Sequence, residues 1–258
     1  MRIGIIGVGH IATDVARGLL ASGFDPAKLL IGPRGHGVPA LASRGISVAP
    51  SSAAVVEGCD LVLLAVRPAQ ALEAVTALPW RRHHTLVSLC AGVPIATFRK
   101  VVRKANIVRA IPLGAAAHGG SPTIIFPDDP AVRTLFSHVG SVTALVREED
   151  FAPATVAGVL YTLAHDLVGL TADWAEAQGI APEAARRLAT AQLKAAATML
   201  AADDVTPVAD MVRALATPGG IAETAFGSLD RDAFGVRWRA ALDAGLQRIR
   251  EIEEAHRT

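Results

Sequence analysis

The 258-residue sequence predicts an α/β fold in two parts: a doubly wound, mainly parallel sheet followed by an all-α C-terminal domain. Short apolar runs typical of buried strands alternate with helical patterns as far as Val146. Beyond the charged segment 147–150 only helical patterns follow. We therefore expect one domain over residues 1–150 and a second, all-helical one over residues 151–258.

The first strand and the turn after it carry the most specific motif. Ile3, Ile5 and Ile6 are apolar and β-branched, as a strand buried on both faces requires. The turn reads Gly-x-Gly-x-x-Ala, which permits a sharp turn, a close approach of a pyrophosphate to the backbone, and tight packing of the next helix. This pattern is typical of a Rossmann-type dinucleotide-binding domain. The predicted cofactor contacts are Gly7, Gly9, His10, Ile11 and Ala12.

The end of the second predicted strand, 28–31, indicates which dinucleotide binds. In NAD-binding domains an Asp or Glu near this point binds the ribose 2′-hydroxyl. Here the sequence Gly-Pro-Arg-Gly-His-Gly contains no acid, and Arg34 lies where a cation would meet a 2′-phosphate. We therefore predict NADP(H) rather than NAD. The alternative is that Arg34 and His36 belong to a solvated loop.

The remaining strands of the first domain are expected at 46–48, 60–66, 85–89, 106–109, 121–126 and 141–145, with helices between them, among them 69–78 and one that ends at 104. Ligands of doubly wound sheets bind at the carboxyl ends of the strands. The residues that end the fourth strand, Ala65, Val66, Arg67 and Pro68, should therefore face the cofactor.

The second domain opens with residues 151–178, which are apolar on nearly all faces. A helix tolerates this only when it is buried all round, so a partner subunit should cover it. Further helices are expected at 184–201, 207–216, 221–226 and 234–255.

Composition excludes several function classes. The net charge is +1 and no basic block stands out, so a nucleic-acid partner is not expected. The most apolar stretch, 156–170, is interrupted by His165 and Asp166 and is too short to span a bilayer. The first strand leaves no room for a signal peptide, and Cys59 and Cys90 lie in apolar runs as buried thiols, so we expect a cytoplasmic protein. No spacing indicates a metal site, and no nucleophile motif is present.

Several segments together resemble the pyrroline-5-carboxylate reductase family. Besides the first turn, these are Ala65-Val66-Arg67-Pro68, with Arg in place of Lys, Ser88-Leu89-Cys90-Ala91-Gly92, Val108-Arg109-Ala110-Ile111-Pro112 and Thr217-Pro218-Gly219-Gly220. The resemblance implies an NADP-dependent reductase that transfers hydride to a cyclic imine, most often pyrroline-5-carboxylate to give proline. It also implies a homodimer with exchanged helical domains. It places Ala91 and Gly92 near the cofactor, and Pro112, Leu113, Gly219, Gly220, Ile221 and Ala222 near the substrate.

The substrate half departs from the family pattern. Leu113-Gly114-Ala115 stands where the family has Asn-Thr-Pro, and Ile221-Ala222 stands where it has two Thr. Either backbone N–H groups after Gly220 hold a substrate carboxylate, or the substrate differs.

Three residues are candidates for a catalytic role. Tyr161 could donate to the substrate or serve in packing, and His165 could act in the site or be a buried, hydrogen-bonded histidine. Glu223 could bind an amine or iminium, or favour a helix N-terminus. A cyclic imine can arrive protonated, so no general acid is obligatory.

Two other functions remain open. A β-hydroxyacid dehydrogenase has the same two-part plan but carries a catalytic Lys and a nearby Asn on its interdomain helix. Here no Lys lies between Lys104 and Lys194, and the helical half has no Asn. The loss of the family's substrate motifs also allows a non-catalytic dinucleotide-binding regulatory protein.

Overall fold

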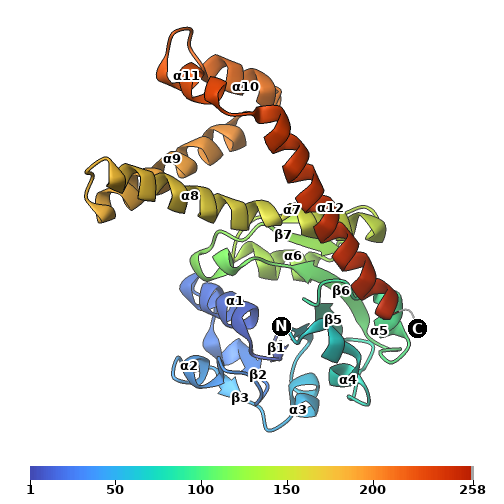
Figure 1. Ribbon diagram of the computed structural model, residues 1–258. Helices are drawn as coiled ribbons and strands as arrows, with labels where there is room; N and C mark the ends of the chain where they lie inside the picture. Colours follow the sequence, from blue (N-terminus) through green and yellow to red (C-terminus); the bar gives the residue numbers. More distant parts are fainter. Residues whose placement is uncertain (257–258) are drawn as a thin grey trace. The chain divides into compact units, whose positions relative to one another are not determined.

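The computed structural model describes residues 1–256, and the chain forms two compact units (Figure 1). Residues 1–156, together with residues 245–256, make the first unit, and residues 157–244 make the second. The division predicted at residue 150 is linear, whereas the first unit is assembled from two separate stretches.

The first unit is built on an eight-stranded sheet with the order β3-β2-β1-β4-β5-β6-β7-β8. All neighbouring strands are parallel except β6 and β7, which are antiparallel, so the predicted doubly wound, mainly parallel sheet is confirmed. The strands are β1 (Ile3–Ile6), β2 (Leu29–Ile31), β3 (Ser47–Val48), β4 (Leu61–Leu64), β5 (Thr85–Ser88), β6 (Asn106–Ile111), β7 (Thr123–Phe126) and β8 (Val142–Ala144).

Helices cover both faces of this sheet, and each face has its own apolar core. On one face α1 (His10–Ala21), α2 (Val38–Ala42) and α6 (Pro130–Ser137) pack on the strands through side chains such as Leu19, Leu41 and Phe136. On the other face α3 (Ser52–Glu57), α4 (Ala71–Val75) and α5 (Ile95–Arg99) do so through Val55, Val75 and Phe98. Burial on both faces explains why the central strands are continuously apolar.

Two predicted helices of the first unit are shorter than expected. The helix predicted over 69–78 is a single 3₁₀ turn, η2 (Pro68–Gln70), followed by α4. Thr76 after α4 is extended, and Leu78 precedes Pro79, whose ring disfavours a helical conformation in the residue before it. The helix expected to reach residue 104 is α5, which ends at Arg99.

The second unit is all-helical, as predicted. It contains α8 (Val159–Ala177), α9 (Pro182–Ala202), α10 (Val208–Leu215), α11 (Ile221–Ser228) and the first part of α12 (Arg231–Ala255). Helices α8 and α9 pack against each other. The helix expected over 151–178 is divided at Gly158 into α7 (Phe151–Ala157) and α8, because glycine is a poor helix former.

Helix α8 carries large apolar side chains that the chain itself leaves exposed. Leu160, Leu170 and Trp174 each keep more than half of their surface accessible, with 59%, 59% and 65% exposed. The segment expected to be too short for a bilayer lies within a 30-residue helical stretch, Glu148–Ala177, that is long and apolar enough to cross a membrane by length and composition. A helix that is buried between two subunits meets the same criterion, so the exposed apolar surface requires a cover of some kind.

Candidate functional site

A cleft of about 670 Å³ lies at the carboxyl ends of β1, β2 and β4. Its walls come from residues 6–9, 32–35, 50–53 and 65–67, together with side chains of η2, α4 and the segment after α4. This is the edge of the sheet at which the sequence predicts the dinucleotide, and the cleft brings together Gly7, Gly9, Arg34, Ala65, Val66 and Arg67 of the predicted set.

The two glycines of the first turn differ in what a side chain at each position would meet. Gly7 has a φ of +86°, and a Cβ there would lie 2.6 Å from Val66 Cγ1, so the fold itself requires glycine. A Cβ on Gly9 would meet no protein atom within 4 Å. The fold leaves open space beside Gly9, which a ligand close to the backbone can use.

Helix α1 begins in this cleft with its N-terminus uncapped. Gly9 is the N-cap residue and offers no side chain, and the first turn contains no acid. The first N–H groups of a helix have no acceptors within the helix, so those of His10 and Ile11 are available to an anion. Ala12 is fully buried against the sheet, as the motif predicts.

The loop after β2 is tied to the first turn by backbone hydrogen bonds. The Val8 N–H donates to the Arg34 carbonyl at 2.9 Å, and the Gly37 N–H donates to the Val8 carbonyl at 3.1 Å. Arg34 is exposed and lines the cleft, and the ring of His36 lies 4.2 Å from that of His10. The structure thus places the predicted 2′-phosphate cation beside the predicted pyrophosphate turn.

The end of β4 forms the opposite wall. Ala65, Val66 and Arg67 line the cleft, and Pro68 begins η2. The buried Cys90 thiol contacts the Val66 carbonyl, with a sulfur–oxygen distance of 3.3 Å. Burial raises the pKa of Cys90 to about 11, so this thiol is neutral near pH 7 and serves as a packing contact rather than a nucleophile.

The turn after β5 has a structural partner that the sequence did not indicate. Gly92 is buried with a φ of +73°, and a Cβ there would lie 2.7 Å from Ile252 Cγ2 on α12. The structure therefore gives Gly92 a packing role beneath the last turns of α12, while the neighbouring Ala91 is half-buried.

Pro112 and Leu113 follow the end of β6. Pro112 is buried, and the Leu113 N–H donates to Ser121 Oγ at 2.8 Å. Ser121 and Thr123 are both fully buried, and their hydroxyl oxygens lie 3.2 Å apart. This pair of hydroxyls fixes the path of the chain where it leaves the sheet.

The candidate residues of the helical unit fall into two groups. Tyr161 and His165 lie one turn apart on α8, with ring centroids 4.5 Å apart, and His165 Nδ1 lies 2.7 Å from the Tyr161 carbonyl oxygen. Both are exposed in the single chain, so His165 is hydrogen-bonded but not buried.

The second group surrounds the N-terminus of α11. Gly220 is its N-cap residue, and Glu223 Oε2 accepts a hydrogen bond from the Gly219 N–H at 2.7 Å. Glu223 thus serves the helix N-terminus, the structural alternative named above. Ile221 is 91% exposed and Ala222 is half-buried, so the backbone there is accessible to a ligand.

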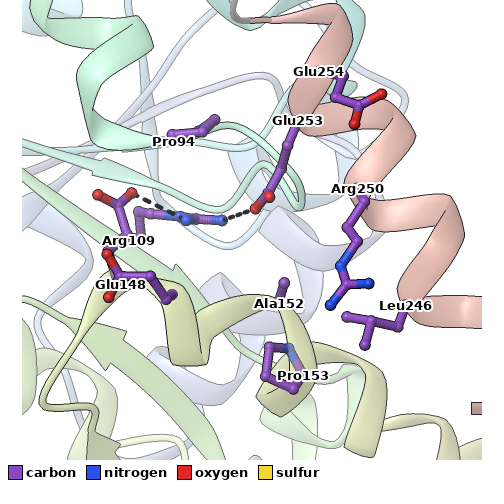
Figure 2. Close-up of a pocket in the computed structure, with 10 residues that line it drawn as sticks. Pro94, Arg109, Glu148, Ala152, Pro153, Leu246, Arg250, Glu253 and Glu254 are labelled. Carbon is purple, nitrogen blue, oxygen red and sulfur yellow. Dashed lines mark hydrogen bonds and ion pairs between the residues drawn. The ribbon is translucent and has the colours of Figure 1, made fainter. Parts of the chain in front are cut away.

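One charged cluster in the first unit was not predicted. Arg109 on β6 is only 2% exposed and lies between Glu148 and Glu253 (Figure 2). Its guanidinium carbon lies 4.2 Å from the centroid of the Phe151 ring. An arginine within an apolar strand was the available signal, because a buried charge requires partners.

The cleft also contains two polar residues outside the predicted set. Ser51 and Ser52 line it, and Ser51 Oγ accepts the Ala54 N–H at the start of α3. Over residues 1–256 no group of three or more His, Cys, Asp or Glu is arranged to hold a metal ion.

Comparisons with known proteins match both units. Residues 2–92 match the family model described as NADP oxidoreductase coenzyme F420-dependent, and residues 152–252 match the one for pyrroline-5-carboxylate reductase dimerisation. The chain is 29% identical to a pyrroline-5-carboxylate reductase of Pseudomonas aeruginosa, covering 98% of the chain and 97% of the relative. It is 27% identical to pyrroline-5-carboxylate reductase 3 of Danio rerio, covering 98% and 91%.

A similar fold is found in a crystal structure of a Plasmodium falciparum pyrroline carboxylate reductase with NADP bound. The TM-score is 0.83 at 20% identity, and the match covers 98% of each chain.

Proposed function

Since the chain belongs to the pyrroline-5-carboxylate reductase family, we propose that it is an NADPH-dependent reductase of cyclic imines, with pyrroline-5-carboxylate as the first candidate substrate and proline as its product. Relatives that span nearly the whole chain carry this activity in their names. The observation that carries the proposal is the cleft itself, where an uncapped helix N-terminus lies beside open space at Gly9.

The residues of the cleft fit a phosphorylated dinucleotide. Backbone N–H groups at the start of α1 would hold the pyrophosphate, and Arg34 would bind the 2′-phosphate. Residues 32–47 contain no acid to accept from a ribose 2′-hydroxyl. These features favour NADPH over NADH, and the related structure with NADP bound supports the same choice.

When bound, the cofactor supplies the hydride. The protein then has to place the acceptor carbon and exclude water. Ala65, Val66, Arg67 and Pro68 would flank the nicotinamide half from β4, with Ala91 and Gly92 contributing from the turn after β5.

Substrate recognition would use the start of α11. The N–H groups of Ile221 and Ala222 can hold a carboxylate, because the first turn of a helix leaves them without acceptors. Glu223 lies in the same first turn, where its carboxylate accepts the Gly219 N–H and its negative charge would also favour an iminium. Tyr161 and His165 supply one hydroxyl and one imidazole on α8, and Pro112 and Leu113 would contribute the end of β6.

The chemistry of this set points to a substrate with few polar groups. Where the family has Asn-Thr-Pro and two Thr, this chain has Leu113 and Ile221-Ala222. In a site that lacks side-chain donors, the polar groups of a substrate lose their water and gain no hydrogen-bond partner, which disfavours a polar substrate. A less polar cyclic imine is therefore the second candidate.

We propose that a second copy of the chain covers the apolar side chains exposed on α8, in a homodimer with exchanged helical units. The match of residues 152–252 to a dimerisation model supports this cover rather than a membrane. The buried thiols Cys59 and Cys90, neither of which forms a disulfide, support a reducing, cytoplasmic location.

The test is to mix purified protein with NADPH and pyrroline-5-carboxylate and to follow loss of NADPH absorbance. A panel of less polar cyclic imines and of keto acids runs beside it, together with NADH as the alternative donor. Reduction of an imine supports the proposal, whereas reduction of keto acids alone indicates a hydroxyacid dehydrogenase. Cofactor binding without turnover of any compound indicates a non-catalytic dinucleotide-binding protein.

Arg34→Ala tests the choice of cofactor. We expect the variant to lose about 10- to 100-fold in NADPH affinity, since a charge-assisted pair is removed, and to bind NADH nearly as the parent does. Arg44→Ala is the matched control, because it removes an exposed cation that does not line the cleft. Equal losses for both cofactors would contradict the 2′-phosphate role.

A further inference from the structure

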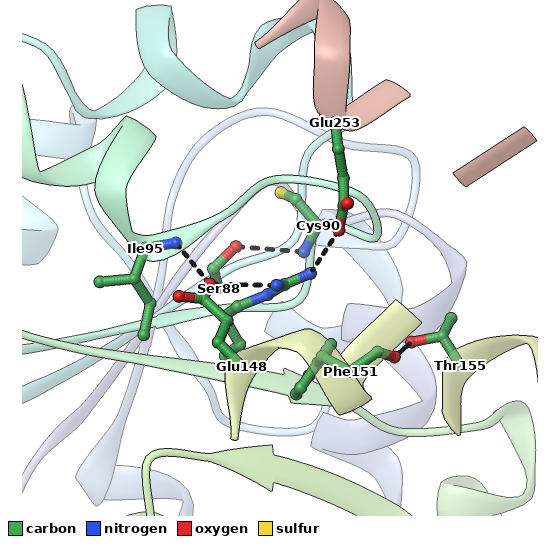
Figure 3. Close-up of polar contacts among 8 residues, drawn as sticks. Ser88, Cys90, Ile95, Glu148, Phe151, Thr155 and Glu253 are labelled. Atoms are coloured by element: carbon green, nitrogen blue, oxygen red, sulfur yellow. Dashed lines mark hydrogen bonds and ion pairs between the residues drawn. The ribbon is translucent and has the colours of Figure 1, made fainter. Parts of the chain in front are cut away.

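The buried guanidinium of Arg109 joins three segments that are distant in sequence: β6 and the segments around residues 148 and 253. Its Nη1 lies 3.1 Å from Glu148 Oε1, and its Nη2 lies 4.0 Å from Glu253 Oε1 (Figure 2). Figure 3 shows the same two carboxylates together with Ser88, Cys90 and Ile95. Glu148 precedes the helical unit in sequence and Glu253 follows it. One side chain on β6 therefore fastens the chain on both sides of the 157–244 unit.

Glu148 connects Arg109 to the turn after β5. The same oxygen that accepts from Arg109, Glu148 Oε1, also accepts the Ile95 N–H at 2.8 Å, at the first residue of α5. Arg109 is itself the register partner of Ser88, the last residue of β5. The segment 88–95, which we name the β5 turn, is thus held at both ends.

The last turns of α12 complete the support. Ile252 lies against Gly92 in the middle of the β5 turn, and Thr97 Oγ1 donates to the His256 carbonyl at 3.2 Å. Cys90, also in this turn, contacts the carbonyl of Val66 in the cofactor cleft. A displacement of the β5 turn would therefore reach the cleft wall.

The electrostatics explain why the cation is needed. Burial lowers the pKa of Arg109, while Glu148 and then Glu253 act in the opposite direction, so the ion is retained through its partners. Its Nε is buried with no hydrogen-bond partner among the described residues, so the desolvated cation depends on Nη1 and Nη2. Without Arg109, two carboxylates would face each other across its position and repel.

From these contacts we propose that Arg109 is a positioning residue, which acts through Glu148 and Glu253 to hold the β5 turn in the conformation that accepts the nicotinamide half of the cofactor. The effect of Arg109 on catalysis rests on the proposed function. Its effect on the conformation of the β5 turn can be tested without measuring turnover.

The direct test is hydrogen exchange of Arg109→Met. We expect amides of residues 88–97 and 245–256 to exchange at least tenfold faster, with little change in β1 to β3. Leu135→Ala is the control for general destabilisation, because Leu135 is a buried residue of α6 in the core on the other face of the sheet from α5. Equal exchange in Arg109→Met and the parent, or the same pattern in both variants, would overturn the proposal.

The functional test compares NADPH binding with turnover. We expect Arg109→Met to raise the KM and Kd for NADPH about tenfold, with a smaller change in kcat, and Arg109→Lys to fall between it and the parent. If Arg109→Met is too unstable to purify, Glu253→Gln takes its place, since it keeps the shape and removes one partner. If Arg109→Met lowers the melting temperature as much as Leu135→Ala does but leaves the Kd for NADPH unchanged, then Arg109 has only a structural role and the proposal is refuted.

A rescue variant separates repulsion from lost packing. In Arg109→Met, the added changes Glu148→Gln and Glu253→Gln remove the two unpaired carboxylates, and we expect them to restore part of the slow exchange and of the NADPH affinity. No recovery would contradict the electrostatic argument. Failure of all imine substrates, with the exchange pattern as expected, would reject the reductase function and leave the positioning role standing.

Discussion

Gly9→Ala should separate cofactor binding from folding more cleanly than any other change in the cleft. The backbone at Gly9 has a φ of −88° and a ψ of −163°, an extended conformation that alanine adopts freely. The new methyl group would meet no protein atom within 4 Å. It would occupy the space that a pyrophosphate needs to reach the start of α1.

The expected effect on stability is small because two contributions nearly cancel. Alanine is the poorer N-cap residue, at a cost of about 0.5–1 kcal/mol. Restricting the unfolded chain stabilises the protein by about 0.4–1 kcal/mol. The net change is within about 0.5 kcal/mol, which shifts the melting temperature by about 2 °C or less.

The expected effect on the cofactor is large. Forcing one extra methyl into a tight contact costs about 1–3 kcal/mol, which corresponds to a loss of roughly 5- to 150-fold in NADPH affinity. The assay is a fluorescence titration with NADPH beside a thermal melt followed by circular dichroism. Unchanged affinity would refute the assignment of this turn to the phosphates, and a fall of more than about 5 °C would show that the fold needs Gly9.

Gly7→Ala is the matched control, two residues away in the same turn. Here the φ of +86° and the 2.6 Å approach to Val66 Cγ1 oppose any side chain. Folding and cofactor binding should therefore fall together in this variant, whereas in Gly9→Ala only binding falls.

Three further predictions concern other parts of the molecule. Burial lowers the pKa of His84 in the folded protein, so the unfolded chain takes up a proton more readily than the folded one. The stability contributed by burying the neutral imidazole is present above about pH 6.5 and is lost as the pH falls below it. The parent should therefore lose more melting temperature between about pH 7.5 and 5.5 than His84→Gln, and equal losses would contradict this. Gly92→Ala should lower stability by about 1–3 kcal/mol in denaturant titrations, and Ile252→Ala in the same chain should make the change at Gly92 less costly, because it removes the clash but not the positive φ. Leu170→Glu on the exposed face of α8 should halve the mass measured by light scattering, whereas Ser137→Glu on α6 should leave it unchanged; an unaltered mass in both would oppose α8 as the subunit interface.

The sequence predicted the fold of the sheet and of its first turn because their signals are local. Apolar runs define the strands, and the spacing of Gly7, Gly9 and Ala12 places turn and helix together within one short segment. Arg34 was singled out for the same reason, since it closely follows a predicted strand. The structure places Gly7, Gly9 and Arg34 in one cleft at the edge of the sheet.

The support of the cleft could not be predicted because it depends on contacts between distant segments. Nothing near Arg109 in sequence shows that its partners are residues 148 and 253. Gly92 matched a family motif and is predicted as a cofactor contact, but nothing in the sequence showed that Ile252 also packs against it. Such pairings arise only from the fold.

The return of residues 245–256 to the first unit has a consequence for how the protein is made. Folding during synthesis generally proceeds from the N-terminus, domain by domain. The nucleotide-binding unit cannot do so completely, because Ile252 and Glu253 emerge only after the whole helical unit. Until then Gly92 lacks its cover, Arg109 lacks one of its two carboxylates, and closing a loop of about a hundred residues is still to come. We expect the nascent first unit to stay open along the β5 turn, which makes this turn the segment most in need of protection before the chain is finished.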